Sequence, residues 1–182
     1  MTLPAALALL LATYLAIATT LLGWHTPGYL ARRDSLSHLG ENGRGYARIT
    51  NFGVFLPIAV GCGWLALQAV PFSPQQGLSL SLAIGYLGAV LWPLQASPHP
   101  ANRWHYLAGG IEYIGGIAAL AWAGATTSNA ASTYLLVAGL ALLGITRSLV
   151  PATKNRAGQW QRLAEASLFL GQYLLLSPAF YS

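Results

Sequence analysis

The charged side chains of this chain are confined to three short windows, and the long stretches between the windows are apolar. The windows run from Arg32 to Arg48, from Arg103 to Glu112 and from Arg147 to Glu165. They hold all 9 Lys and Arg residues and all 4 Asp and Glu residues of the 182-residue sequence. Charged residues make up 7% of the chain, whereas a water-soluble domain carries about 25%. The pattern therefore predicts a polytopic membrane protein.

The uncharged stretches are long enough for six membrane-spanning helices. A bilayer core of about 30 Å is crossed by roughly 20 apolar residues in a helix, which satisfies its own backbone groups in lipid. Pro71 and Pro74 divide one stretch, and the polar residues 126–129 divide another. Apolar runs this long without alternation argue against a β-barrel. We expect one all-α transmembrane domain, residues 1–182, with helices over about 3–24, 50–70, 77–95, 104–124, 132–150 and 163–180.

The basic residues predict how these helices are oriented. All nine lie in or beside the first, third and fifth loops, and the second and fourth loops have none. Because cytoplasmic loops collect Lys and Arg, we expect the odd loops to be cytoplasmic and both termini to be extracytoplasmic, in the bacterial inner (plasma) membrane. We expect the first helix to be retained, since no basic residue precedes it and its apolar run exceeds that of a signal peptide. The net charge of +5 then faces anionic lipid headgroups, and the scattered basic residues do not suit nucleic acid binding.

Loop 1, which joins the first two helices, carries the first candidate site residues. Asp34 and His38 are four residues apart, so a turn of helix would place both on one face. We take these two as catalytic candidates. Ser37, between them, and Asn51, at the start of the second helix, are candidate ligand-binding residues. A solvated loop with a short interfacial helix, and an Asn51 that caps its helix or bonds across the bundle, are the alternatives.

Loop 3, between the third and fourth helices, is stiffened by two prolines and carries His99, Arg103 and His105. These residue types suit a phosphate headgroup or a metal ion. Arg103 and His105 are therefore candidate ligand-binding residues, and His38, His99 and His105 are candidate metal ligands. Their spacing matches no standard zinc pattern. In the alternative interpretation Arg103 is a topology anchor and the histidines are interfacial polar residues.

Glu112 is the one acidic residue well inside an expected span. Positions 105, 109, 112 and 116 share a helix face that reads His, Gly, Glu, Gly. Glycines let a neighbouring helix approach closely, so we expect Glu112 to be buried and bonded to His105, Arg103 or Arg48. An ionisable group in that position is a functional candidate, which makes Glu112 the third catalytic candidate. A buried structural carboxyl group is the alternative.

The few ionisable groups are expected to gather at one place. Loop 1 is long enough to fold over loop 3, which would bring Asp34, His38, His99, His105 and Glu112 into one cytoplasmic-side cluster with His38 near His105. The remaining acid near a span, Glu165, is explained by an i,i+3 ion pair with Arg162 at the start of the sixth helix.

Two short segments resemble a known family. The run Leu36-Ser37-His38-Leu39-Gly40, followed by Asn51-Phe52-Gly53, resembles a pattern in the DUF998 family of six-helix bacterial and archaeal membrane proteins. That family has a Ser-x-Leu-Gly element after its first helix, an Asn near the start of its second, and a proline-containing loop before a His that opens its fourth. Pro98, Pro100 and His105 stand in the latter places, although this loop 3 carries less acid than the family's. The resemblance implies a six-helix fold and brings no activity or cofactor with it.

Three functions fit these observations. The first is a small integral membrane protein that binds a lipid or amphiphile at its cytoplasmic face. The second is an intramembrane metal-assisted lipid hydrolase, in which the histidines and Asp34 or Glu112 hold a metal that activates water. The third is an accessory subunit of a larger membrane complex, or a homo-oligomer. The scarcity of polar groups inside the spans argues against an ion channel or a proton-coupled transporter.

Overall fold

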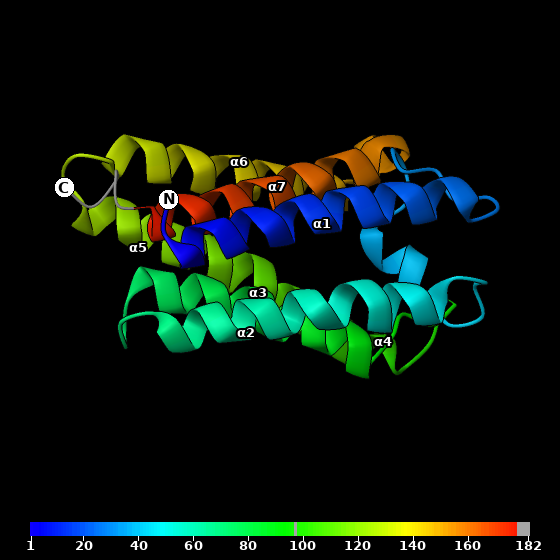
Figure 1. Ribbon diagram of the computed structural model, residues 1–182. Helices are drawn as coiled ribbons and strands as arrows, with labels where there is room; N and C mark the ends of the chain where they lie inside the picture. The colour runs from blue at the N-terminus through cyan, green and yellow to red at the C-terminus, as the bar shows by residue number, and fades with distance from the viewer. Residues whose placement is uncertain (97, 178–182) are drawn as a thin grey trace.

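The chain folds into a bundle of helices. The computed structural model describes residues 1–96 and 98–177, and these contain six helical rods and no strand (Figure 1). The rods are α1 (Leu3–His25), η2 with α2 (Ile49–Phe55 and Leu56–Gln68), α3 (Pro74–Leu91), α4 with η3 and α5 (Asn102–Gly110, Ile111–Gly115 and Gly116–Thr126), α6 (Ala131–Leu149) and α7 (Ala157–Leu176). Two 3₁₀ helices, η1 (Leu36–Gly40) and η4 (Pro151–Arg156), lie in the connections. The all-α prediction is confirmed.

Four of the six rods are long and apolar enough to cross a membrane. They are α1, the rod over residues 49–68, the rod over residues 102–126, and α6. The other two are more polar, since α3 begins with Pro74-Gln75-Gln76 and α7 contains Arg162 and Glu165. The chain therefore has membrane-spanning character over these four rods.

The helix ends follow local capping chemistry. The hydroxyl of Thr2 accepts a hydrogen bond from the Ala5 amide and begins α1, and Ser73 caps α3 in the same way, with Pro74 in the first turn. The expected breaks after the second and fourth helices are both present. The largest boundary difference is in α7, which begins at Ala157, whereas the sequence predicted a start near residue 163; α3 also begins and ends a few residues before the expected range 77–95. Residues 178–180 of that expected helix lie outside the described residues.

Small residues allow the closest helix contacts. A β-carbon on Gly144 of α6 would lie 2.6 Å from the Trp160 carbonyl oxygen of α7, so these two backbones approach closely there. The other large interface joins α2 and α3, and α1 packs on both α2 and α7. The start of α1 lies beside the end of α7, because the Thr2 hydroxyl donates to the Leu176 carbonyl at 3.0 Å.

Candidate binding cavity

Loop 1, residues 26–48, lies folded across one end of the bundle. On one side the amides of Gly158 and Gln159 in α7 donate to the carbonyls of Arg33 and Arg32, both at 3.1 Å. On the other side the Asn42 amide donates to the Leu94 carbonyl, in the connection between α3 and α4, at 2.8 Å. The prediction that loop 1 folds over loop 3 is therefore confirmed.

Asp34 organises the first half of loop 1. Its carboxylate accepts from the Leu30 amide at 2.8 Å and forms an ion pair with Arg33 at 2.7 Å. Burial opposes the charged form, but these hydrogen bonds outweigh it, and the pKa of Asp34 is lower than its ordinary value. The Arg162 guanidinium donates to the Asp34 carbonyl at 3.1 Å and to the Tyr29 hydroxyl. Asp34 thus holds the fold of the loop that covers the bundle.

Asn51 holds the second half of loop 1. Its side-chain amide donates to the Gly40 carbonyl at 2.9 Å, and both residues are buried. A β-carbon on Gly40 would lie 2.2 Å from the Asn51 Oδ1 atom, so only glycine fits at this contact. Asn51 lies outside the cavity described below. The structure therefore gives Asn51 a loop-anchoring role. Gly40 and Asn51 both belong to the segments that resemble the DUF998 family, and they lie in contact.

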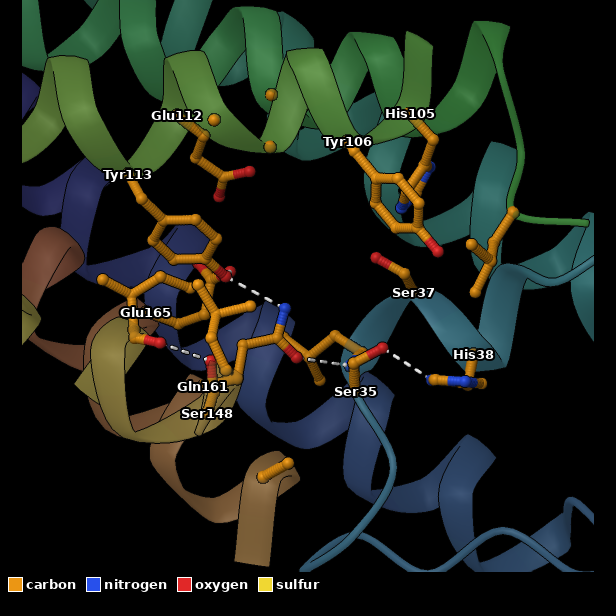
Figure 2. Close-up of a pocket in the computed structure, with 18 of the residues that line it drawn as sticks. Ser35, Ser37, His38, His105, Tyr106, Glu112, Tyr113, Ser148, Gln161 and Glu165 are labelled. Carbon is orange, nitrogen blue, oxygen red and sulfur yellow. Dashed lines mark hydrogen bonds between the residues drawn. The ribbon is translucent and has the colours of Figure 1, made fainter. Parts of the chain in front are cut away.

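A cavity of about 1070 Å³ lies beneath loop 1. Loop 1, α3, the rod from α4 to α5, α6, η4 and α7 all contribute to its wall. Asp34, Ser37, His38, His105 and Glu112 line it, as Figure 2 shows for the last four. These five predicted site residues are thus brought together around one cavity. The close approach of His38 and His105 stays a prediction.

The cavity has a polar rim. The Ser35 hydroxyl and His38 Nδ1 are hydrogen-bonded at 2.7 Å in the rim formed by loop 1. Burial lowers the pKa of His38, while the charges of Glu41 and Asp34 oppose that shift. Lys154 of η4 and Arg33 also line the cavity, so cationic groups are present near its loop 1 side.

One flank of the cavity is apolar. Ile114 and Ile117 line it from the fourth rod, and Leu142, Ile145 and Leu149 line it from α6. Ile114, Leu142 and Leu149 have large solvent-exposed fractions. α6 packs closely along α5 and makes few contacts with the fourth rod toward α4.

The inner end of the cavity contains a buried polar network centred on Glu165 of α7. The Tyr113 hydroxyl donates to Glu165 Oε1 at 2.5 Å, and the Tyr86 hydroxyl donates to Oε2 at 2.9 Å. Gln161 extends the network, because its amide donates to the Tyr113 hydroxyl at 3.0 Å and its carbonyl accepts from the Leu36 amide at 2.9 Å. The network thereby joins loop 1 to α3, η3 and α7.

The prediction for Glu165 was wrong. Arg162 points to the backbone of loop 1, and the two ion pairs within the described residues are Arg33–Asp34 and Arg44–Glu41. Because α7 begins at Ala157, Glu165 lies two turns inside that helix and is buried. The sequence reasoning placed it in the first turn, where an interfacial ion pair is the ordinary expectation.

Glu112 is buried, as predicted, but its partner was not foreseen. It is 6% exposed, and neither His105 nor Arg103 nor Arg48 bonds to it in the described part of the chain. Its carboxyl group interacts with that of Glu165. The helix that makes room for Glu112 is α3, where a β-carbon on Gly85 would lie 2.3 Å from Glu112 Oε2.

The glycines of the fourth rod do not all have the expected packing role. Gly109 and Gly110 line the cavity and have open space where a side chain would lie. Gly116 does lie against neighbouring helices, because a β-carbon at that position would contact Leu168 and Leu78. The shared face therefore forms a cavity wall at Gly109 and packs closely against Gly85 of α3 at Glu112.

Loop 3 contributes less to the site than predicted. His99 is exposed, and its Nδ1 accepts from the Ala101 amide at 3.1 Å. Arg103 is exposed and stacks over Trp104 at 5.2 Å. His105 Nδ1 bonds to the Trp92 carbonyl at 3.0 Å, which fixes the ring at the cavity wall. His99 and Arg103 are therefore outside the cavity, and no group of three His, Cys, Asp or Glu side chains within residues 1–96 and 98–177 is arranged to hold a metal ion.

Two π-helical turns were missed by the sequence analysis. One, η2, contains Asn51, and the other, η3, contains Glu112 and Tyr113. A π turn widens a helix and often occurs at functional sites. In η3 it accompanies the burial of two consecutive polar residues on the inner side. Hydropathy patterns assume a regular period, so they carry no signal for such a turn.

Comparisons of this chain with protein-family models, with curated proteins and with solved structures gave no match. The resemblance to the DUF998 family stays a prediction.

Proposed function

We propose that this chain is an integral membrane protein that binds a lipid or another amphiphile in the cavity beneath loop 1. The observation that carries the proposal is the cavity itself. Its volume of about 1070 Å³ is slightly above the range of small-molecule sites, about 300–1,000 Å³.

The lining supports an amphiphile over a wholly polar ligand. An apolar flank formed by the fourth rod and α6 suits a hydrocarbon chain, and the rim of Ser37, His38 and Lys154 suits a headgroup. In this proposal the cavity opens sideways between Ile114 and Leu142, which both line it and are exposed, so that such a molecule moves in from the bilayer without crossing water. Membrane lipids are accordingly the expected partners.

The proposal includes an orientation in the membrane. The nine basic residues lie in or beside the connections at the loop 1 end of the bundle (Figure 1). Basic loops favour the cytoplasmic side. The proposed arrangement has six spans, the cavity rim at the cytoplasmic face of a bacterial inner membrane, and the start of α1 and the end of α7 on the opposite side.

The test fills the cavity with a side chain. Gly110 lines the cavity and has open space beside it, so Gly110→Leu would place an isobutyl group where the ligand is expected. Gly139→Leu is the matched control, because Gly139 is exposed on α6, has open space and does not line the cavity. Both changes replace a helical glycine, so their effects on helix propensity are similar.

The readout is the lipid retained by each purified protein in a mild detergent, measured by native mass spectrometry. We expect the wild-type chain and Gly139→Leu to retain bound lipid and Gly110→Leu to lose at least about tenfold in affinity, or ~1.4 kcal/mol. Equal retention by the two glycine variants would contradict binding in this cavity.

A further inference from the structure

Two buried carboxyl groups at the inner end of the cavity take part in no ion pair among the described residues. Glu112 is 6% exposed and Glu165 is 5% exposed. Within the described residues, the acids that form ion pairs are Asp34 and Glu41. Two neighbouring carboxylates in an apolar bundle repel each other and lose hydration, so the pair favours a proton or a cation beside it.

The two acids differ in how well they are satisfied. Glu165 accepts hydrogen bonds from Tyr113 and Tyr86 on its two oxygens. Glu112 Oε1 is buried and has no hydrogen-bond partner within residues 1–96 and 98–177. Buried polar atoms in native proteins are nearly always bonded, so an unbonded one points to a missing partner. Figure 2 shows the Glu112 carboxylate on the cavity side of its helix.

The position of this pair in the cavity indicates the chemical class of that partner. Both Glu112 and Glu165 line the cavity, and it continues from them along the apolar flank of Ile117 and Ile145. An occupant that satisfies both regions has a hydrogen-bond donor with positive charge joined to an apolar chain. An anionic headgroup is disfavoured at this end, because two acids repel it. Among the described residues, neither acid belongs to a group of three His, Cys, Asp or Glu side chains that could hold a metal ion.

We propose that Glu112 and Glu165 form the binding site for the ammonium group of an amphiphilic amine, with the apolar chain of that amine along the fourth rod and α6. This inference rests on the proposed function and deepens it by naming the ligand class. Glu112 accepts from the ammonium group directly. Tyr113 and Tyr86 hold Glu165 in place beside it.

The experiment compares two probes that differ in charge and share one chain. Dodecylamine and dodecanol are titrated into the full-length protein in an uncharged detergent, and their dissociation constants are measured with the wild-type chain, Glu112→Gln and Glu41→Gln. Glu41 also lines the cavity but is paired with Arg44 at 2.7 Å, so its variant removes the same formal charge at the rim. We expect wild-type protein to prefer dodecylamine by at least about tenfold, which corresponds to ~1.4 kcal/mol. Glu112→Gln should lose most of this preference, and Glu41→Gln should keep it.

Each other result has a distinct meaning. If both probes bind equally to the wild-type chain and Gly110→Leu blocks both, the cavity binds amphiphiles but the ammonium site is wrong. If Glu112→Gln keeps the full preference, or Glu41→Gln loses it equally, the charge recognition does not lie at Glu112. If neither probe binds and Gly110→Leu changes nothing, the proposed function itself fails. The wild-type comparison requires no variant, so it decides the ligand class even if Glu112→Gln does not fold.

Discussion

The carboxyl group of Glu165 accepts hydrogen bonds from hydroxyl groups on two different helices. Tyr86 comes from α3 and Tyr113 from η3, and both hydroxyls are buried with it. Buried polar atoms without partners cost about 1–3 kcal/mol each, whereas a hydrogen bond that is made contributes about 1 kcal/mol net. The network therefore specifies which faces of these helices meet. Substitutions that remove one partner and leave another unpaired are expected to lower the stability of the protein the most.

We expect Glu165→Leu to lower the thermal stability of the protein, because two buried tyrosine hydroxyls lose their acceptor at about 1–3 kcal/mol each. Glu165→Gln retains one carbonyl oxygen and should be less destabilised. The control combines Glu165→Leu with Tyr86→Phe and Tyr113→Phe, which removes the unpaired hydroxyls. Thermal unfolding in one detergent compares the three proteins. A combined variant less stable than Glu165→Leu alone would refute this account.

The lowered pKa of His38 predicts that the stability of the protein depends on pH. Burial lowers its pKa in the folded state, so the unfolded chain takes up a proton first as the pH falls. The stability contribution of the neutral ring is present above the unfolded pKa of about 6.5. It is lost as the pH falls through the folded pKa. We expect the melting temperature of the wild-type protein to decrease on acidification from about pH 7.5 to about 5.5. The melting temperature of the His38→Gln variant should decrease less. Identical profiles for the two proteins would exclude His38 as the source.

At the scale of elements, the main feature is loop 1, a long loop that is attached to the bundle on both sides. Backbone hydrogen bonds attach loop 1 to α7 and to the α3–α4 connection. Asn51 in the π turn η2 attaches it to the second rod. The cavity lies beneath this loop, where α6 makes few contacts with the fourth rod toward α4.

The Gly40 contact gives a test of this attachment. Gly40→Ala would place a methyl group 2.2 Å from Asn51 Oδ1, and Asn51 cannot move away without losing its bond to the Gly40 carbonyl. We expect the free energy of unfolding to fall by about 1–3 kcal/mol, as for other overpacked positions. We also expect faster tryptic cleavage after Arg44. Gly45→Ala is the matched control, since Gly45 has open space and an exposed position. Equal cleavage rates in the two variants would show that loop 1 does not depend on this contact.

At the scale of the whole molecule, the charge distribution gives the bundle two different ends. All nine basic residues lie in the connections at the loop 1 end or in the helix ends beside them, and the connections at the other end hold none. Such an asymmetry sets the orientation during insertion. In the proposed orientation the cavity rim lies on the side where anionic headgroups attract cations.

Cysteine labelling of intact cells and of inverted vesicles tests the orientation. Asn42→Cys lies in loop 1 and Ser128→Cys lies in the α5–α6 connection, and neither position is buried. We expect a membrane-impermeant maleimide to label Ser128→Cys from outside and Asn42→Cys only in inverted vesicles. The unchanged chain is the control, because its one cysteine, Cys62, is fully buried. The opposite labelling pattern would mean that the protein is inverted.

Much of the fold was predictable because its determinants are local. A helix long enough to cross a bilayer is recorded in one continuous apolar segment, and Pro74 and the polar residues 126–129 end such segments by their own chemistry. Four of the rods have that length and apolarity. The burial of Glu112 also followed from sequence, since an acid within an apolar segment is expected to face the protein interior.

The tertiary structure alone decided which groups meet. The pairing of Glu112 with Glu165, the two tyrosines that support it and the room left by Gly85 come from α3, η3 and α7, and no local pattern relates these segments. Even the position of Glu165 depended on where α7 begins, and that start is fixed by the docking of loop 1 on Gly158. Hydropathy describes how each segment partitions between water and lipid, whereas the chemistry of the cavity depends on distances between segments, which only packing determines.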